Sequence, residues 1–248
     1  MHRHSSHLNI IFTALIKKMK PPLLLLHGAI GAASQFAPLH EVLRESFTTH
    51  SFDFEGHGEK AFANRPFRIE QFAENLASFI DEHNLQPCCI FGYSMGGYVA
   101  LHLAATKPQY IKKIYTLATK FNWSAESAAK ESAMLNPDKI IEKIPAFAQS
   151  LDARHIHGWK ENLQRTAEMM HDLGESPALN ETALKKISVP CRIAVGDADT
   201  MVTREETEKF SSFIQDAAYR VLHNTLHPLE KINPSLLKQE LEEFFIRA

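Results

Sequence analysis

A serine between two glycines, in Gly92-Tyr93-Ser94-Met95-Gly96, is the feature that most restricts how this chain can fold. Before it, the apolar run 87–91 has the length and composition of a buried strand. After it, the small and apolar residues of 95–107 predict a helix, which Pro108 ends. A serine on so sharp a strand-to-helix turn has a strained backbone, and the glycines let the chain close up around it. The pattern therefore predicts a serine hydroxyl above the end of a sheet, at a helix N-terminus that favours negative charge.

The rest of the chain alternates short apolar runs with helical patterns, which is typical of a parallel sheet covered by helices on both faces. Strands are predicted at 23–26, 48–54, 88–91, 111–117, 191–195 and 218–222. Helical spacing of apolar residues predicts helices over 34–45, 69–80 and 236–245. We therefore predict an α/β protein with a doubly wound, mostly parallel sheet, formed by a single domain over residues 23–248.

Between residues 121 and 187 the alternation stops, and only helical patterns and helix breakers remain. Asn136-Pro137, for example, fits a helix cap followed by proline at the first helical position. We predict that 121–187 is a helical insertion, a cap over the site rather than an independent domain. Its large apolar residues are then candidates to bind substrate, although each could instead only hold the insertion in place. They are Trp123, Trp159, Met169 and Met170.

Composition limits the class of protein. A net charge of -2 indicates neither a nucleic-acid partner nor a membrane surface. The 3 cysteines lie in predicted strands without Cys-x-x-Cys spacing, which argues against a disulfide framework and against a metal site. A reducing compartment, the cytoplasm, is the expectation.

Residues 1–22 are predicted to be an N-terminal tail or an edge strand. The apolar stretch 8–16 is broken by Asn9 and Thr13, and no small-residue cleavage site follows. We therefore expect neither a signal peptide nor a membrane span there. The part most suited to an edge strand is 10–15.

Other candidate site residues follow predicted strands, at the sheet edge where open α/β folds bind ligands. His27-Gly28-Ala29 comes after the first strand, and a glycine there lets the next amide point at an oxyanion. Asp197 and Asp199 follow the strand at 191–195, and either carboxylate could orient a histidine. His227 lies in the last loop, with His223 as a nearby rival in a chain that has 14 histidines.

Together these motifs resemble the α/β-hydrolase fold family from residue 23 to residue 245. The resemblance rests on Leu26-His27-Gly28, Asp53-x-x-Gly56-His57-Gly58, Gly92-Tyr93-Ser94-Met95-Gly96-Gly97, Gly196-x-x-Asp199, and His227 with Glu230 behind it. It implies that Ser94 is the nucleophile, Asp199 the acid and His227 the base, in the chain order of that family. It also implies oxyanion-hole amides at Ala29 and Met95. In the family Gly56-His57-Gly58 is a structural loop, so His57 receives no catalytic role.

The chain departs from the family at two places. Leu226 precedes the histidine where the family usually has glycine, and the antiparallel strands that usually open the fold are shortened or missing.

The implied activity is hydrolysis of a small carboxylic ester through an acyl-enzyme, with a small-molecule substrate and no cofactor. Alternatives are carbon–carbon bond hydrolysis or a menaquinone-pathway-like lyase reaction, for which Arg154 or Arg165 would bind an acidic substrate. Cofactor-free perhydrolysis and non-catalytic ligand binding are further alternatives on the same fold.

Overall fold

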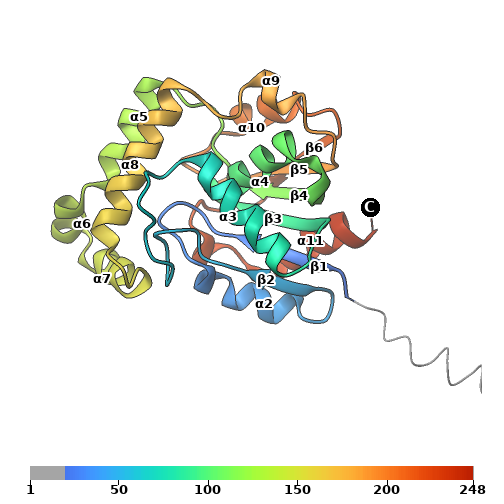
Figure 1. The fold of residues 1–248 in the computed structure, drawn as a ribbon, viewed down its shortest axis with the longest axis horizontal. Helices are drawn as coiled ribbons and strands as arrows, with labels where there is room; N and C mark the ends of the chain where they lie inside the picture. The colour runs from blue at the N-terminus through green and yellow to red at the C-terminus, as the bar shows by residue number, and fades with distance from the viewer. Residues whose placement is uncertain (1–19, 248) are drawn as a thin grey trace, which may run out of the picture.

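The computed structural model describes residues 20–247. The fold is built around one six-stranded sheet (Figure 1). All neighbouring strands run parallel, in the order β2-β1-β3-β4-β5-β6. Their bounds are β1 (Pro22–Leu26), β2 (Thr48–Ser51), β3 (Cys88–Tyr93), β4 (Ile111–Leu117), β5 (Cys191–Gly196) and β6 (Ala217–Leu222). The predicted α/β fold class, with its parallel sheet, is confirmed.

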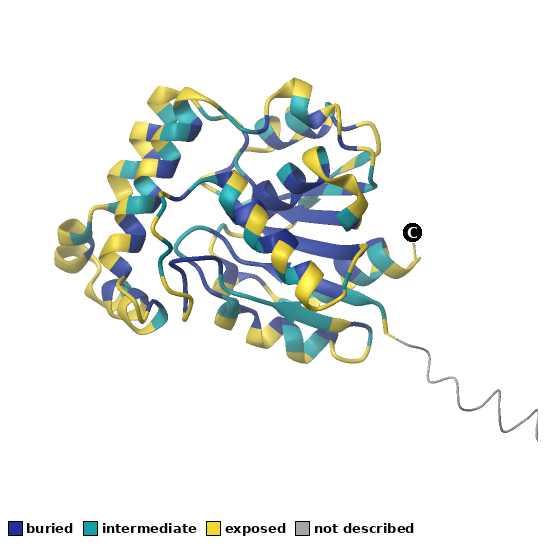
Figure 2. Cartoon of the chain, in the orientation of Figure 1, coloured by how far each residue is buried: buried dark blue, intermediate teal, exposed yellow. Residues whose placement is uncertain are grey.

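Helices cover both faces of this sheet. One face carries α3 (Ile69–Glu82), α4 (Met95–Thr106), the short α9 (Glu181–Leu184) and α10 (Arg204–Ser211). The other carries the 3-10 turn η1 (Ala33–Phe36), α2 (Ala37–Leu43) and α11 (Pro234–Glu242), which continues as a π-turn over Glu243–Arg247. A sheet covered in this way buries the side chains on both faces of its inner strands, and Figure 2 shows β1, β3, β4 and β5 as mostly buried, whereas the edge strands β2 and β6 are partly exposed.

Strand β1 shows why a strand that is covered on both faces of the sheet consists entirely of apolar residues. Leu24 and Leu26 pack into the core under α3 and α4, and Leu23 and Leu25 pack into the core under α2 and α11. All four are at most 1% exposed. Each such side chain contributes roughly 1.5–3 kcal/mol of transfer free energy to folding.

Except for α9, the helices between β4 and β5 form a separate layer beside the sheet, on the left of Figure 1. They are α5 (Ala125–Ser132), α6 (Pro137–Lys143), α7 (Pro145–Arg154) and α8 (Trp159–Glu175), with a 3-10 turn at Ala133–Leu135. The Ser124 side chain accepts a hydrogen bond from Ser127 N, and the Asn136 side chain accepts one from Lys139 N. These helices have an apolar cluster of their own, made of Ile140, Ala148, Leu151, Trp159 and Leu163.

Several elements differ from their predicted bounds. The predicted strand 48–54 ends at Ser51, because the chain then leaves β1 and Phe54 N donates to His27 Nε2 instead. The predicted helix 34–45 is divided between η1 and α2. Of the predicted tail or edge strand over residues 1–22, residues 1–19 lie outside the described residues.

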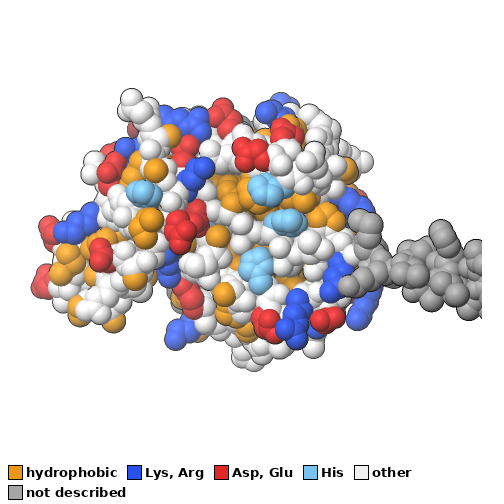
Figure 3. Space-filling model, turned by 60° about the horizontal axis from the view of Figure 1, so that its bottom comes forward, with side chains coloured by type: hydrophobic (Ala, Val, Ile, Leu, Met, Phe, Trp, Pro, Cys, Tyr) orange, Lys and Arg blue, Asp and Glu red, His pale blue; other side chains and the backbone are white. Residues whose placement is uncertain are grey.

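The surface has no dominant charge on the face seen in Figure 3, where acidic and basic side chains are interspersed. No helix between residues 20 and 247 has the length and apolar character that crossing a membrane requires.

Three buried histidines form a row: His27 after β1, His57 in the loop after β2 and His155 between α7 and α8. The rings of His27 and His57 are 5.1 Å apart, and those of His57 and His155 are 5.8 Å apart. Burial lowers the pKa of each imidazole, that of His27 to about 4. Nearby Asp53 opposes this shift for His27 and His155, whereas Arg154 adds to it.

We expect these histidines to make the protein less stable in mild acid. In the unfolded chain they bind protons near pH 6.5, whereas in the folded protein they bind them only at lower pH. The free energy of unfolding is therefore fully retained above pH 6.5 and falls below it, by up to about 1.4 kcal/mol per pH unit for each histidine. Denaturant unfolding at a series of pH values measures the slope. His57→Phe, in a site already lined by Phe67 and Phe72, should reduce that slope, and an unchanged slope would contradict the assignment.

Candidate active site

Ser94 lies on a tight turn between β3 and α4. Its backbone has φ 51° and ψ -117°, a region that non-glycine residues rarely occupy. Hydrogen bonds hold the turn on both sides, since Ser94 N donates to Leu117 O at 2.8 Å and Thr119 Oγ1 donates to Ser94 O at 3.0 Å. A strained residue persists only when its surroundings over-determine it, and here β4 and the loop that follows it supply both hydrogen bonds.

Glycines allow the turn to pack against the sheet. A Cβ atom at Gly92 would lie 2.5 Å from Gly97 Cα, and one at Gly96 would lie 2.4 Å from Leu26 O, at the end of β1. A Cβ atom at Gly28 would lie 3.2 Å from Ser94 Cβ. The loop that follows β1 therefore lies directly against Ser94.

A buried carboxylate–imidazole pair lies on the loops after β5 and β6. Asp199 Oδ2 accepts a hydrogen bond from His227 Nδ1 at 2.8 Å, and the Asp199 side chain is 0% exposed. Its other oxygen, Oδ1, accepts from Met201 N at 2.8 Å and from Val202 N at 2.9 Å. With Nδ1 donating to Asp199, the neutral His227 ring presents Nε2 as a proton acceptor.

A second Asp–His pair lies beside the first but faces solvent. His223 Nδ1 and Asp197 Oδ2 are 3.0 Å apart, and the His223 side chain is 87% exposed. The hydrogen bond from His223 lowers the pKa of Asp197. The residues alone left Asp197 and His223 open as alternatives, whereas the family resemblance implied Asp199 and His227. In the structure Asp199 and His227 form the less exposed of the two pairs.

The loop that carries His227 is tied to its neighbours. Tyr93 Oη donates to His227 O at 2.5 Å, and burial raises the pKa of Tyr93, which keeps the phenol protonated. A Cβ atom at Gly196 would lie 2.0 Å from Thr225 O, so the loops after β5 and β6 are in close contact. Leu226, which replaces the glycine usual in the family, is 46% exposed and is accommodated because its side chain reaches solvent.

The loop after β1 is held from both sides. His27 Nδ1 donates to Gly28 O at 2.8 Å, and its Nε2 accepts from Phe54 N at 3.2 Å. Ile30 has φ 54°, an uncommon value for a β-branched residue. His155 Nε2 and Arg154 Nη1 both donate to Ile30 O, at 2.9 and 3.1 Å.

Ile30 also connects this loop to the helical insertion, because its side chain packs against the apolar cluster of Trp159 and Leu163. The sequence does not predict this contact. No local signal marks a β-branched residue for a positive φ, and no pattern pairs residue 30 with residues 154 and 155.

Two cavities meet at Ser94. The inner cavity has a volume of about 60 Å3 and contains Ser94, His227, Ala29 and Met95. Its remaining lining residues are Ile69, Tyr98, Lys120, Trp123, Glu131, Met169, Met170, Leu173, Met201 and Val202. The outer cavity, of about 250 Å3, shares Ala29, Ser94, Met170, Met201 and His227 with it and extends past Arg154 to Glu230.

The candidate substrate-binding residues are thus divided. Trp123, Met169 and Met170 line the inner cavity, beside Ser94. Trp159 lines neither cavity, since it is buried in the apolar cluster of the insertion.

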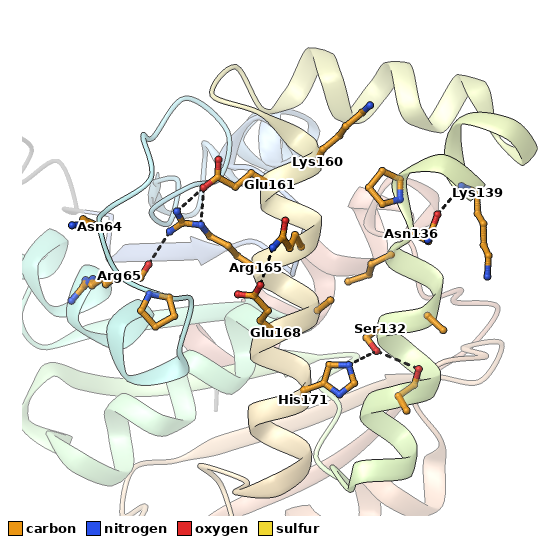
Figure 4. Close-up of a pocket in the computed structure, with 17 residues that line it drawn as sticks. Asn64, Arg65, Ser132, Asn136, Lys139, Lys160, Glu161, Arg165, Glu168 and His171 are labelled. Atoms are coloured by element: carbon orange, nitrogen blue, oxygen red, sulfur yellow. Dashed lines mark hydrogen bonds and ion pairs between the residues drawn. The ribbon is translucent and has the colours of Figure 1, made fainter.

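The two candidate arginines also lie in different places. Arg154 borders the outer cavity, where Nη2 donates to Glu230 Oε1 at 2.9 Å. Arg165 lines a wide groove between α8 and the α5–α6 segment, where it bonds to Glu161 and to the carbonyl of Arg65 (Figure 4). Ser94 is not among the residues that line this groove.

Among residues 20–247, no group of three or more His, Cys, Asp and Glu side chains is arranged to hold a metal ion. Cys88, Cys89 and Cys191 are free and buried, and burial raises the pKa of Cys88 and of Cys191 to about 12.

Comparison with known proteins agrees with this architecture. The sequence model of the alpha/beta hydrolase fold family matches residues 21–155, more than half of the chain, so the protein belongs to that family. The chain is 27% identical to Serine hydrolase-like protein 2 of Homo sapiens over 157 residues, which cover 62% of this chain and 50% of that protein. The chain thus spans half the length of that relative.

Two further relatives carry activities in their names. The pimeloyl-[acyl-carrier protein] methyl ester esterase of Xylella fastidiosa (strain M12) is 36% identical over 99 residues, 40% of this chain and 37% of that enzyme. The crystal structure of the enol-lactonase from Burkholderia xenovorans LB400 has a TM-score of 0.75 at 20% identity, with 91% of each chain covered. At that level of identity the structural likeness shows the fold alone.

Proposed function

We propose that this protein is a serine hydrolase that cleaves a small carboxylic ester through an acyl-enzyme. The observation that carries the proposal is the buried hydrogen bond between Asp199 Oδ2 and His227 Nδ1, in a site where His227 borders the same cavity as Ser94. An esterase among the relatives supports the same reaction class.

In the proposed mechanism, Ser94 Oγ attacks the ester carbonyl while its proton passes to His227 Nε2. Asp199 stabilises the imidazolium that forms, and the amides of Ala29 and Met95 donate hydrogen bonds to the oxyanion. The alcohol leaves with the proton from His227. Water then attacks the acyl-enzyme as His227 takes one of its protons, and the carboxylic acid and free Ser94 are released.

The segment 121–187 is proposed to be a cap that selects the substrate, because Trp123, Met169 and Met170 come from it and line the inner cavity. A cavity of about 60 Å3 suits a short substituent on one side of the carbonyl, with the other side in the outer cavity. The buried free thiols suit a reducing compartment, so we place the protein in the cytoplasm.

We prefer ester hydrolysis to carbon–carbon bond hydrolysis of an acidic substrate. That reaction requires a cation for the substrate carboxylate, and Arg154 is already engaged by Glu230 and by the carbonyl of Ile30. The remaining candidate, Arg165, lines the groove away from Ser94.

A series of 4-nitrophenyl esters with acyl chains of increasing length tests the proposal. We expect a burst of nitrophenol equal to the enzyme concentration, then steady turnover that is fastest for short chains. An acidic diketone and hydrogen peroxide are tested beside them. Cleavage of the diketone without ester turnover would favour carbon–carbon hydrolysis, and binding of esters without turnover would favour a non-catalytic role.

The same series tests the cap. Met169→Ala and Met170→Ala enlarge the inner cavity, and each added methylene that finds apolar space contributes about 0.8 kcal/mol. We expect the ratio of kcat/KM for long over short esters to rise about tenfold in these variants. Trp159→Phe is the control, since Trp159 is buried in the apolar cluster of the insertion and lines neither cavity. If the ratio of kcat/KM for long over short esters were the same in all these variants, the assignment of Met169 and Met170 to the substrate cavity would be contradicted.

A further inference from the structure

The inner cavity contains one polar cluster besides Ser94 and His227. Lys120, three residues after the end of β4, and Glu131, on α5, face each other there with Nζ and Oε1 3.7 Å apart. Trp123 completes the cluster, with Lys120 Nζ 5.6 Å from its ring centroid. The other residues that the cap contributes to this cavity are Met169, Met170 and Leu173.

Two atoms of this cluster are buried without a hydrogen-bond partner in the described part of the chain. They are the acceptor Glu131 Oε2 and the donor Trp123 Nε1. Glu131 is only 6% exposed, so its free oxygen has little access to solvent. The distance of 3.7 Å between Lys120 and Glu131 is also longer than a hydrogen bond. Buried polar atoms are rarely left unpaired, so an unpaired donor and acceptor in a substrate cavity indicate what the substrate supplies.

We propose that Lys120, Trp123 and Glu131 form a subsite for an uncharged hydroxyl or carboxamide group on the substrate. The oxygen of such a group accepts from Trp123 Nε1 or Lys120 Nζ, and its O–H or N–H donates to Glu131 Oε2. A carboxylate would lie against the anion of Glu131, and an ammonium group would lie against the cation of Lys120. The charges of the pair therefore exclude both kinds of ion and accept a neutral group that both donates and accepts.

Ester substrates then carry a hydroxyl or carboxamide on the part that enters the inner cavity. This inference rests on the proposed function, because it places the carbonyl at Ser94. The alternative is that the Lys120–Glu131 pair only joins α5 to the segment after β4. The same pair, with Met201, also borders a wider polar cavity between α5 and α10, so a longer substituent has space beyond it.

The test compares esters that differ only in the terminal group. Ethyl 6-hydroxyhexanoate and ethyl adipamate are compared with ethyl heptanoate, which has a methyl group in place of the hydroxyl. The charged esters are monoethyl adipate and ethyl 6-aminohexanoate, and ethyl 3-hydroxybutanoate with ethyl 3-methylbutanoate forms a shorter pair. We expect kcat/KM for a hydroxyl or amide ester to exceed that for its methyl analogue by at least tenfold, because buried polar groups without partners disfavour the analogue.

Three variants assign the preference to the cluster. In Glu131→Gln the amide oxygen stays toward Lys120 Nζ and the NH2 group takes the place of Oε2, so the free acceptor is replaced by a donor. Trp123→Phe removes the free indole donor, and both changes alter the shape little. Both should lower the ratio of hydroxyl to methyl ester at least tenfold. The control is Glu126→Gln, an exposed change of the same chemistry on the same helix, which should keep the wild-type ratio.

Binding separates this proposal from the proposed function. Calorimetry of the ester pairs with Ser94→Ala measures the preference for hydroxyl over methyl esters in binding alone. This test remains valid even if no ester is cleaved. Failure of every ester to turn over would overturn the proposed reaction. A wild type that does not distinguish hydroxyl from methyl in turnover or in binding would overturn the subsite, as would variants that change both esters equally.

Discussion

Ser94→Ala should abolish labelling by a fluorophosphonate probe and lower ester hydrolysis by about 10³-fold or more. The expectation follows from the turn geometry, since Ser94 has the strained backbone and borders both cavities. Only background catalysis from the oxyanion amides would remain. Mass spectrometry of the labelled wild-type protein should find one adduct, on Ser94.

A matched control is Ser34→Ala, which removes an exposed hydroxyl on η1 and should leave labelling and turnover as in the wild type. Circular dichroism of both variants verifies the fold. Labelling that persists in Ser94→Ala would place the nucleophile elsewhere.

Asp199→Asn should lower kcat by about 10⁴-fold, the larger of the two effects. Met201 N and Val202 N donate to Asp199 Oδ1, so an asparagine would keep its oxygen there and turn its NH2 group toward His227. Nδ1 would then have to accept, and the proton of the neutral ring would move to Nε2. A ring protonated at Nε2 cannot take the proton of Ser94.

The second Asp–His pair supplies the control for this substitution. Asp197→Asn changes the same functional group two residues away, in a solvent-facing pair with His223, and should alter kcat less than about threefold. Likewise His227→Ala should lower kcat by about 10³-fold or more, and His223→Ala should have little effect. If Asp197→Asn or His223→Ala lowered kcat strongly while Asp199→Asn lowered it little, the assignment of the two pairs would be reversed.

Much of the fold could be predicted from local patterns. The six strands, the helices on both sides of them and the helical segment between Leu117 and Cys191 all appear in the sequence as apolar periodicity and as breakers such as Pro108. A fully covered parallel sheet requires continuous apolar strands, and β1 and β3 provide them. The exceptions, the short β2 and the divided helix after residue 33, depend on contacts with His27 and on turns that periodicity does not report.

The positions of the candidate site residues also follow from the sequence, because loops at the carboxyl ends of parallel strands meet at one edge. The motifs around Gly28, Ser94, Asp199 and His227 therefore identify the right loops. Taken alone, these residues leave open which aspartate is buried and which histidine it meets, and only the resemblance to the family favours Asp199 and His227. That choice depends on Asp199 receiving two backbone amides within its own loop and on the contact of Gly196 with Thr225.

By itself, then, the sequence determined the sheet, the strained turn at Ser94 and the loops that carry the site, because each of these is written in a local pattern. Only the tertiary structure decided the pairings across distant segments. It joined Asp199 to His227, held the carbonyl of Ile30 by Arg154 and His155, buried Trp159 away from the cavities and brought Lys120 to Glu131. Such pairings depend on how the helical insertion packs on the sheet, and residue spacing along the chain carries no information about that packing.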